Sequence, residues 1–143
     1  MKKYLIIFLG ICLIQSACYA FGFKKKQKPV LFLSPISPQI ELEKSGTIKS
    51  FDVFKKDNKI YFLIYTPFGF KSDYIKYQIV KQDDNAHEGG YSRVRAKNVR
   101  IKDKHTYSDY FTLSQTGKYY IQIFDIENLH QWRAFGGFRV VEE

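Results

Sequence analysis

Apolar residues recur at every second position through most of the chain beyond residue 40, and this period constrains the fold more than any other feature. The segment YIKYQIVK is the clearest case, because Ile75, Tyr77 and Ile79 alternate with polar residues. Successive side chains of a strand point to opposite faces, so the pattern predicts a strand with one buried face. The same alternation predicts strands at residues 107–113, 119–124 and 135–141.

The segment FDVFKKDNKIYFLIY predicts a strand, a turn and a second strand. Lys56 to Lys59 form the expected turn, and Ile60 to Tyr65 is apolar on both faces, which is typical of a central strand. Beyond Ile40 the chain contains no long stripe of apolar residues with the helical period. Seven or eight short strands separated by turn residues predict an all-β fold, an antiparallel sandwich of two sheets.

The segment LSQTGKYYIQIF resembles the start of strand F in immunoglobulin-like and fibronectin-like domains. In those domains a glycine or alanine two residues before a tyrosine makes the tyrosine corner, and here Gly117 and Tyr119 take these positions. Ile121 stands where an antibody domain has its second cysteine. The resemblance implies an Ig-like sandwich in which the Tyr119 hydroxyl bonds a backbone group just upstream, and it implies nothing about function.

The N-terminus predicts export. Lys2 and Lys3 precede an apolar run from Leu5 to Ile14, which has the length of a signal-peptide core and is short for a membrane span. We expect a signal peptide at residues 1–20, cut after Ala20. One alternative treats QSAC as a lipobox that makes Cys18 the lipid-bearing first residue, and another is an uncleaved anchor. All three place the body of the protein in the periplasm or elsewhere in the cell envelope.

Residues 21–38 are expected to form a basic, proline-containing tether, and residues 39–143 one domain. The chain carries a net charge of +9, and the two lysines of the leader account for two of these charges, which leaves +7 for the rest. This excess favours an anionic partner. Lys24, Lys25 and Lys26 could contact anionic lipid if the segment is held at a membrane. Both cysteines precede Phe21, so the remainder of the chain forms no disulfide.

The segment RVRAKNVRIKDK holds the densest positive charge. Alternation predicts that Arg93, Arg95 and Lys97 share one face of a strand, and a bulge near Asn98 would bring later cations onto the same face. The residues concerned are Arg93, Arg95, Lys97, Arg100, Lys102 and Lys104. Two interpretations remain open: the charges protect an edge strand from pairing with other chains, or they form a docking stripe for an anionic polymer or acidic protein.

Two aromatic loops could supply a second binding surface. PFGFKSDY and ENLHQWRAFGG would meet at one end of an Ig-like sandwich, where the B–C and F–G loops gather. Phe70, His130, Trp132 and Arg133 then combine flat rings with hydrogen-bonding groups, as a sugar-binding or protein-binding surface requires. The alternative is that Phe68 and Phe135 plug the end of the core.

No catalytic or metal motif is recognisable in the sequence. The segment from Asp83 to Glu88 is rich in oxygen donors, but its spacing is not that of an EF-hand and a solvated hairpin tip explains it. His105 and Asp109 would lie on one face of a strand and Ser108 on the other, so they cannot form a triad. We therefore expect no enzyme, no metal and no cofactor.

The sequence predicts an exported, non-catalytic binding module of the bacterial cell envelope. It would engage a protein partner through an edge strand or the aromatic loop end. The alternative is a module that binds carbohydrate or an anionic polymer through Trp132 and the basic strand, with an anionic glycan or lipid as the ligand. The leader argues against nucleic acid as the partner. The sequence does not define an oligomeric state.

Overall fold

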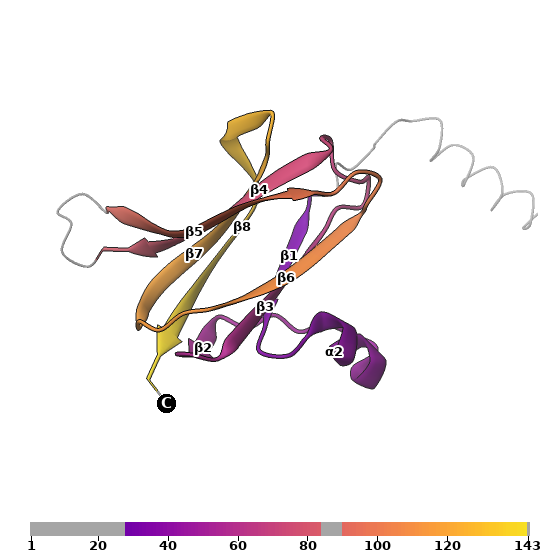
Figure 1. The fold of residues 1–143 in the computed structure, drawn as a ribbon. Helices are drawn as coiled ribbons and strands as arrows, with labels where there is room; N and C mark the ends of the chain where they lie inside the picture. Colours follow the sequence, from indigo (N-terminus) through magenta and orange to yellow (C-terminus); the bar gives the residue numbers. More distant parts are fainter. Residues whose placement is uncertain (1–27, 84–89, 143) are drawn as a thin grey trace, which may run out of the picture.

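The computed structural model describes residues 28–83 and 90–142, which form one helix and eight strands (Figure 1). In chain order they are β1 (Val30–Ser34), α2 (Pro38–Ser45), β2 (Val53–Lys55), β3 (Lys59–Tyr65), β4 (Tyr74–Gln82), β5 (Tyr91–Arg100), β6 (Thr106–Thr112), β7 (Gly117–Asp125) and β8 (Asn128–Val141). The chain is therefore mostly β, as the period-two pattern predicted.

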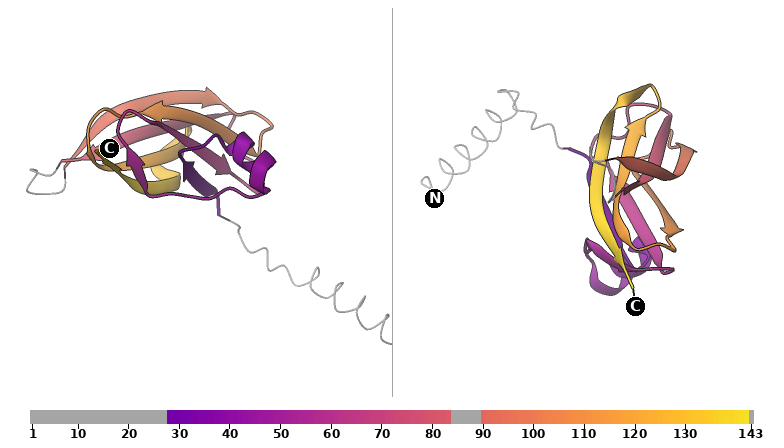
Figure 2. Two further views of the ribbon diagram at one scale, coloured as in Figure 1. Left: turned by 90° about the horizontal axis from the view of Figure 1, so that it is seen from below. Right: turned by 90° about the vertical axis from the view of Figure 1, so that its left-hand side faces the viewer.

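The strands make two sheets. The smaller has the order β1-β3-β6, and the larger has the order β2-β8-β7-β4-β5. Neighbouring strands are antiparallel except β2 and β8, which are parallel, so the larger sheet is mixed and not purely antiparallel as predicted. Figure 2 shows the molecule from two further directions, with β8 running along the larger sheet.

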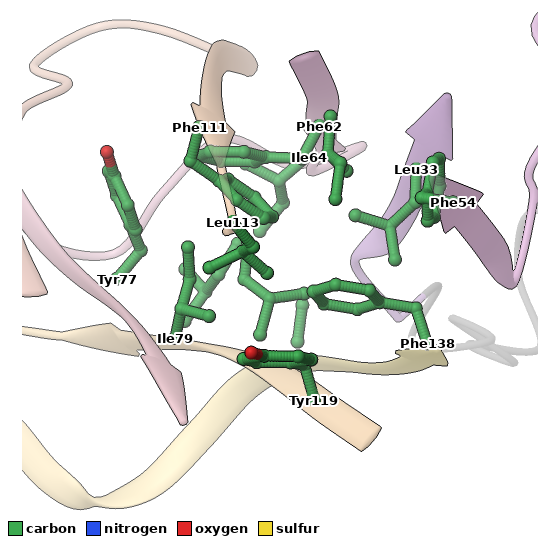
Figure 3. Close-up of a cluster of buried hydrophobic side chains, with 14 of the residues drawn as sticks. Leu33, Phe54, Phe62, Ile64, Tyr77, Ile79, Phe111, Leu113, Tyr119 and Phe138 are labelled. Atoms are coloured by element: carbon green, nitrogen blue, oxygen red, sulfur yellow. The ribbon is translucent and has the colours of Figure 1, made fainter. Parts of the chain in front are cut away.

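One core joins the inner faces of the two sheets. The Phe62 ring of β3 lies 4.9 Å from that of Tyr77 on β4, and the Phe111 ring of β6 lies 5.8 Å from that of Phe138 on β8. Figure 3 shows these rings among the aliphatic side chains that fill the space between the strands. Burying such a side chain stabilises the fold by roughly 1.5–3 kcal/mol.

The strand predictions for the middle of the chain are confirmed. Ile75, Tyr77 and Ile79 of β4 are fully buried, and β3 is the central strand of the smaller sheet. The turn between β2 and β3 contains Asp57 with a φ of 61°, a left-handed conformation that aspartate tolerates better than most residues. These two strands do not pair with each other, because β2 joins β8 while β3 joins β1 and β6.

The tyrosine corner is present. The Tyr119 hydroxyl donates a hydrogen bond of 2.8 Å to the backbone carbonyl of Gln115, four residues upstream, and the ring is buried. Gly117 has a φ of 144°, and a Cβ there would lie 2.8 Å from Cε of Lys81. The backbone conformation therefore favours glycine, whereas the flexible end of the Lys81 side chain can shift.

The segment before residue 53 differs from the prediction. Val30–Ser34 pairs with β3, so β1 occupies part of the segment 21–38 that was expected to be a tether. The last residue of this expected tether, Pro38, instead begins α2, which ends at Gly46 with a φ of 69°. An eight-residue helix is too short to display a recognisable apolar stripe.

The predictions for the N-terminus fall outside the described residues. They concern the signal peptide at 1–20, the lipidation of Cys18, and the lysines Lys24, Lys25 and Lys26. Within residues 28–83 and 90–142, no helix is both long and apolar enough to cross a membrane.

Candidate functional site

The strand β5 lies at one edge of the larger sheet, where it pairs only with β4 among the described residues. Figure 1 shows it at the side of the molecule, next to β4. Residues Tyr91 to Asn98 are exposed on both faces of the strand, and only Val99 is half-buried against the core. We call the side of β5 that faces away from β4 its open edge. The sequence-predicted basic segment therefore coincides with an edge strand.

The β-bulge of this strand lies at Val94, so its expected position near Asn98 is wrong. Ile79 of β4 is opposite Arg95, and the next residue, Val80, is opposite Arg93, which leaves Val94 as the extra residue of β5. A bulge changes which face each later side chain occupies. Arg93 therefore does not share a face with Arg95 and Lys97.

The cations of the segment are divided between both faces of the sheet. Lys97 lies opposite Tyr77 and Arg95 opposite Ile79, so these two share the inner face. Arg100 lies opposite Tyr74 on the outer face. Lys102 and Lys104 follow the strand in an exposed turn. The predicted single row of six cations does not form.

Most of these cations have no acidic partner among the described residues. Of the three ion pairs found there, only the one between Lys97 and Asp109 involves β5, with Nζ 2.9 Å from Oδ2. A shallow depression of about 450 Å³ follows the strand. It is lined by Lys76, Arg93, Val94, Arg95, Ala96, Lys97 and Asn98. Cations gathered in one depression produce a positive electrostatic potential there.

Behind the inner face of β5, Asp109 of β6 collects three hydrogen bonds on one carboxylate oxygen. The hydroxyls of Tyr77 and Tyr107 each donate to Oδ2 over 3.0 Å, and Nζ of Lys97 donates to it over 2.9 Å. The backbone N–H of Tyr110 donates to Oδ1 over 2.9 Å. We call the residues Tyr77, Lys97, Tyr107 and Asp109 the Asp109 cluster. Figure 3 shows the Tyr77 hydroxyl directed away from the apolar side chains.

The hydrogen bonds set the protonation states in this cluster. Burial alone would raise the pKa of Asp109, but the hydrogen bonds from Lys97, the Tyr110 backbone and the two tyrosines lower its pKa to about 2. Burial, reinforced by the hydrogen bond to the Asp109 carboxylate, raises the pKa of Tyr77 to about 12 and also raises the pKa of Tyr107. Asp109 is therefore an anion and both tyrosines are neutral at physiological pH.

The Asp109 cluster connects the two sheets, because Tyr107 and Asp109 belong to β6 of the smaller sheet while Tyr77 and Lys97 belong to β4 and β5 of the larger sheet. Sequence reasoning missed it. The four residues are spread over 33 positions from Tyr77 to Asp109, and no local spacing brings them together. The only sequence signal is an aspartate in a strand that otherwise alternates normally, TYSDYFT.

The two aromatic segments meet at one end of the molecule, as predicted, but the second one is not a loop, because all of it except Glu127 belongs to β8. Lys71 and Ser72 from the first loop line a small cavity of about 180 Å³ together with residues of β7, β8 and the turn between them. Figure 1 shows this turn at the end opposite α2. Neither Phe68 nor Phe135 plugs the core, since they are 73% and 44% exposed. Phe70 packs against the core instead.

The other predicted residues of the loop end are placed as follows. Arg133 is half-buried, with Nε 2.9 Å from Oδ2 of Asp125. His130 is exposed, and its backbone N–H donates to Asn128 Oδ1 over 3.3 Å. Trp132 belongs to β8, but its side chain lies outside the described part of the structure. The structure therefore brings Arg133 into a cavity and leaves the role of Trp132 a prediction.

No catalytic triad or metal centre forms among the described residues. His105 precedes β6, and its Nδ1 lies 3.2 Å from the carbonyl oxygen of Thr66. The Asp109 carboxylate accepts hydrogen bonds from the Tyr77 and Tyr107 hydroxyls of the Asp109 cluster and, among the described residues, accepts none from His105. The described ranges contain no group of three or more histidine, cysteine, aspartate or glutamate residues placed to hold a metal ion. Most of the Asp83 to Glu88 segment lies outside these ranges, and Asp83 itself accepts a hydrogen bond from Ser92.

Comparison with known proteins gives a fold but no family. No protein-family model matches the sequence, and no curated protein matches it. Among solved structures, the chain is similar to the PmoD soluble domain from Methylocystis sp. ATCC 49242 (Rockwell), with a TM-score of 0.50 and 13% identity over 79% of this chain and 90% of that one. This likeness supports an all-β fold built of sheets.

Two further structures are superoxide reductases (neelaredoxins) from Ignicoccus hospitalis. One matches with a TM-score of 0.43 and 10% identity over 80% of this chain and 81% of that one. The other, a variant form, has a TM-score of 0.44 and 10% identity over 81% of this chain and 82% of that one. These matches contradict the expectation that the chain is not an enzyme, and that exclusion is withdrawn. At this similarity they assign no reaction to this chain.

Proposed function

We propose that this protein is an exported binding module of the bacterial cell envelope that captures an extended acidic segment of a partner protein along the open edge of β5. The observation that carries the proposal is a ten-residue edge strand with cations on both faces. Arg93, Arg95 and Arg100 have no carboxylate within ion-pair distance among the described residues.

The backbone of β5 can accept another strand. The N–H of Ile101 donates to the Asp73 carbonyl over 2.8 Å, which fixes the alternation of hydrogen bonds along the β4–β5 ladder. By that alternation, Ala96, Asn98 and Arg100 direct their N–H and C=O groups to the open edge. An extended segment could pair with these groups, a mode of recognition in which backbone bonds supply affinity and side chains supply specificity.

The division of charge between the faces favours a strand as the ligand. An added strand places alternate side chains on opposite faces, so its carboxylates would meet Arg95 on one face and Arg100 on the other. A flat polymer lying on one face could reach only part of this set. The cations of β5 do not form the predicted single row. Their division between the two faces of the sheet supports a partner whose side chains also alternate between faces.

The same charges oppose pairing between two copies of this chain. Two β5 strands side by side would bring arginines and lysines opposite one another, and like charges directly opposite are destabilising. The bulge at Val94 further limits regular pairing to the part of the strand that follows it. Protection of the edge and selection of an acidic partner are thus compatible roles for the same residues.

Export is proposed on the sequence alone. The charged start, the apolar run and the small residues before Ala20 support a signal peptide, and Cys18 offers lipidation as the alternative. With Cys18 lipidated, Lys24, Lys25 and Lys26 would be held beside anionic headgroups. An exported location restricts the partner to proteins of the envelope.

We also infer that the two layers form an Ig-like sandwich. The tyrosine corner at Tyr119 supports this, and so does the order β8-β7-β4, which corresponds to strands G, F and C of that fold. On this assignment β5 follows strand C as an edge strand of the same sheet, and β1, β3 and β6 form the opposite layer.

A second candidate function is binding of an anionic polymer, such as an acidic glycan. The depression along β5 favours it, because Lys76 and Arg93 line it and an anion lying there needs no backbone pairing. Charge attraction of this kind weakens steeply with salt. Carbohydrate binding through Trp132 remains a prediction from the sequence.

The test uses fluorescence anisotropy of a labelled peptide in which glutamate alternates with threonine. We expect the double variant Arg95→Glu/Arg100→Glu to weaken binding by at least about tenfold. The control Lys44→Glu/Lys55→Glu changes the net charge equally, on α2 and at the opposite edge of the larger sheet, and should bind normally. Equal losses in both variants, or tighter binding of polyglucuronate than of the peptide, would contradict the proposed partner.

A further inference from the structure

A buried carboxylate oxygen marks a second site, on a strand that β4 separates from β5. Asp125 ends β7 and is only 7% exposed, yet its Oδ1 has no hydrogen-bond partner among the described residues. Its other oxygen, Oδ2, lies 2.9 Å from Nε of Arg133. A buried carboxylate oxygen without a donor is costly, so one expects a ligand or solvent to supply a proton-bearing group.

Asp125 lines the cavity of about 180 Å³ between the first aromatic loop and the β7–β8 turn. We call it the Asp125 pocket. Ser72 and Asp125 are its buried members, while Lys71, Glu127 and Gln131 are exposed at its border and Arg133 is half-buried. The volume corresponds to roughly six water molecules at about 30 Å³ each, so only a small ligand fits. It is well below the size of a site for a drug-sized molecule.

The charges of the pocket are balanced. Lys71 and Arg133 are cations, and Asp125 and Glu127 are anions. A metal cation is disfavoured because the Arg133 guanidinium already contacts the carboxylate that would bind it. Among the described residues, two buried side-chain atoms have no hydrogen-bond partner: Asp125 Oδ1, an acceptor, and Arg133 Nε, a donor that lies at ion-pair distance from Asp125 Oδ2. A simple anion is disfavoured because it would leave Asp125 Oδ1 without a donor. The lining suits a molecule that carries one positive and one negative group.

We propose that the Asp125 pocket binds a small zwitterion with a primary ammonium and a carboxylate, the chemistry of a free α-amino acid. The ammonium would donate to Asp125 Oδ1, and the carboxylate would lie toward Lys71 and Arg133. The exposed Gln131 can donate to or accept from a short side chain. This site is independent of the strand β5, which lies beyond β4 at the edge of the sheet.

The first test is a titration of the isotope-labelled, unmodified protein with alanine, followed by NMR. We expect amide shifts at Ser72, Glu127 and Gln131, with a Kd of about 1 mM or tighter. N-acetylalanine lacks the ammonium and alaninamide lacks the carboxylate, so each should bind at least about tenfold more weakly. No shift with alanine, equal binding of N-acetylalanine, or shifts with glucose in place of alanine would overturn the proposal.

Two variants locate the ammonium and carboxylate subsites. Asp125→Asn should abolish the alanine-induced shifts, whereas Asp83→Asn, a carboxylate at the end of β4, should leave them unchanged. If Asp125→Asn disturbs folding through the lost ion pair, Lys71→Gln serves instead, since its side chain is exposed and its loss should weaken alanine but not alaninamide. Unchanged alanine affinity in Lys71→Gln and in a folded Asp125→Asn would refute the assignment.

Discussion

The neighbouring strands β4 and β5 pair along most of their length, yet they carry opposite kinds of surface. The inner row of β4, Ile75, Tyr77 and Ile79, is fully buried. The residues opposite Tyr77 and Ile79 on β5 are Lys97 and Arg95, which are exposed. The smaller sheet covers β4, but its three strands do not extend far enough to bury the inner face of β5.

This difference separates the residues that stabilise the fold from those available for binding. The buried row of β4 contributes hydrophobic free energy that β5 lacks, because β5 removes little apolar surface from water. The Asp109 cluster lies at the boundary, since it joins β4 and β5 to β6. Each prediction below tests one side of this boundary.

The largest expected effect is loss of a buried side chain of β4. Ile79→Ala should lower the free energy of unfolding by about 2–5 kcal/mol, because it leaves a cavity in the core. The matched change on β5, Val94→Ala, removes aliphatic carbon from an exposed position and should cost less than about 0.5 kcal/mol. Urea denaturation measures both. Similar losses in the two variants would remove the distinction between the strands.

The next largest effect on stability concerns the Asp109 cluster, which joins β4 and β5 to β6. Asp109→Asn keeps the shape of the side chain but weakens its acceptance of hydrogen bonds from Tyr77, Tyr107 and Lys97. We expect a loss of about 1–3 kcal/mol at neutral pH, because buried tyrosine hydroxyls lose a charged partner. Asp83→Asn, a more exposed carboxylate, is the control in the same denaturation experiment. An unchanged midpoint for Asp109→Asn would show that the cluster does not stabilise the contact between the sheets.

The pH dependence of stability should report the same cluster. The pKa of Asp109 is about 2 in the folded protein, below its ordinary value of 3.8. A carboxyl group with a lowered pKa stabilises the fold above its unfolded pKa, and this stabilisation is lost as pH falls toward the folded pKa. We expect a loss on the order of 2 kcal/mol between pH 4 and pH 2. The loss should be smaller in Asp109→Asn, and an equal loss in both proteins would assign it to other groups.

The smallest effect on stability concerns the tyrosine corner at Tyr119 of β7, the strand that pairs with β4 on the side away from β5. Tyr119→Phe removes the hydroxyl that donates to the Gln115 carbonyl and leaves the buried ring in place. We expect a loss of about 1 kcal/mol, the usual value of one net hydrogen bond. Tyr110→Phe, on an exposed ring of β6, is the control and should be neutral. An unchanged free energy of unfolding in Tyr119→Phe would mean that the hydrogen bond of the corner does not stabilise the fold.

The sequence predicted the parts of this fold that depend on local patterns. The alternation of Ile75, Tyr77 and Ile79 identified β4 and its buried face, and Gly117 with Tyr119 identified the corner. The helix α2 was missed because eight residues show too little amphipathic pattern. Its terminal signals, Pro38 and Gly46, were present, but the segment up to residue 38 was assigned to a proline-containing tether.

The candidate site was predicted only in part. The sequence located the basic segment, but a bulge at Val94 instead of Asn98 reversed the face of Arg93 relative to Arg95. A bulge depends on pairing with β4, which the local sequence does not encode. The Asp109 cluster and the Asp125 pocket combine residues from different strands, so only the tertiary structure brings them together.

Amide hydrogen exchange tests the central claim, that the open edge of β5 accepts an extended acidic segment by strand pairing. In the protein alone, the amides of Ala96, Asn98 and Arg100 should exchange quickly, because their N–H groups face the open edge. With the alternating glutamate–threonine peptide bound, we predict that these three amides exchange more slowly while those of α2 do not change. Binding of the peptide without any slowing at these amides would contradict strand pairing and leave only charge attraction to the basic surface.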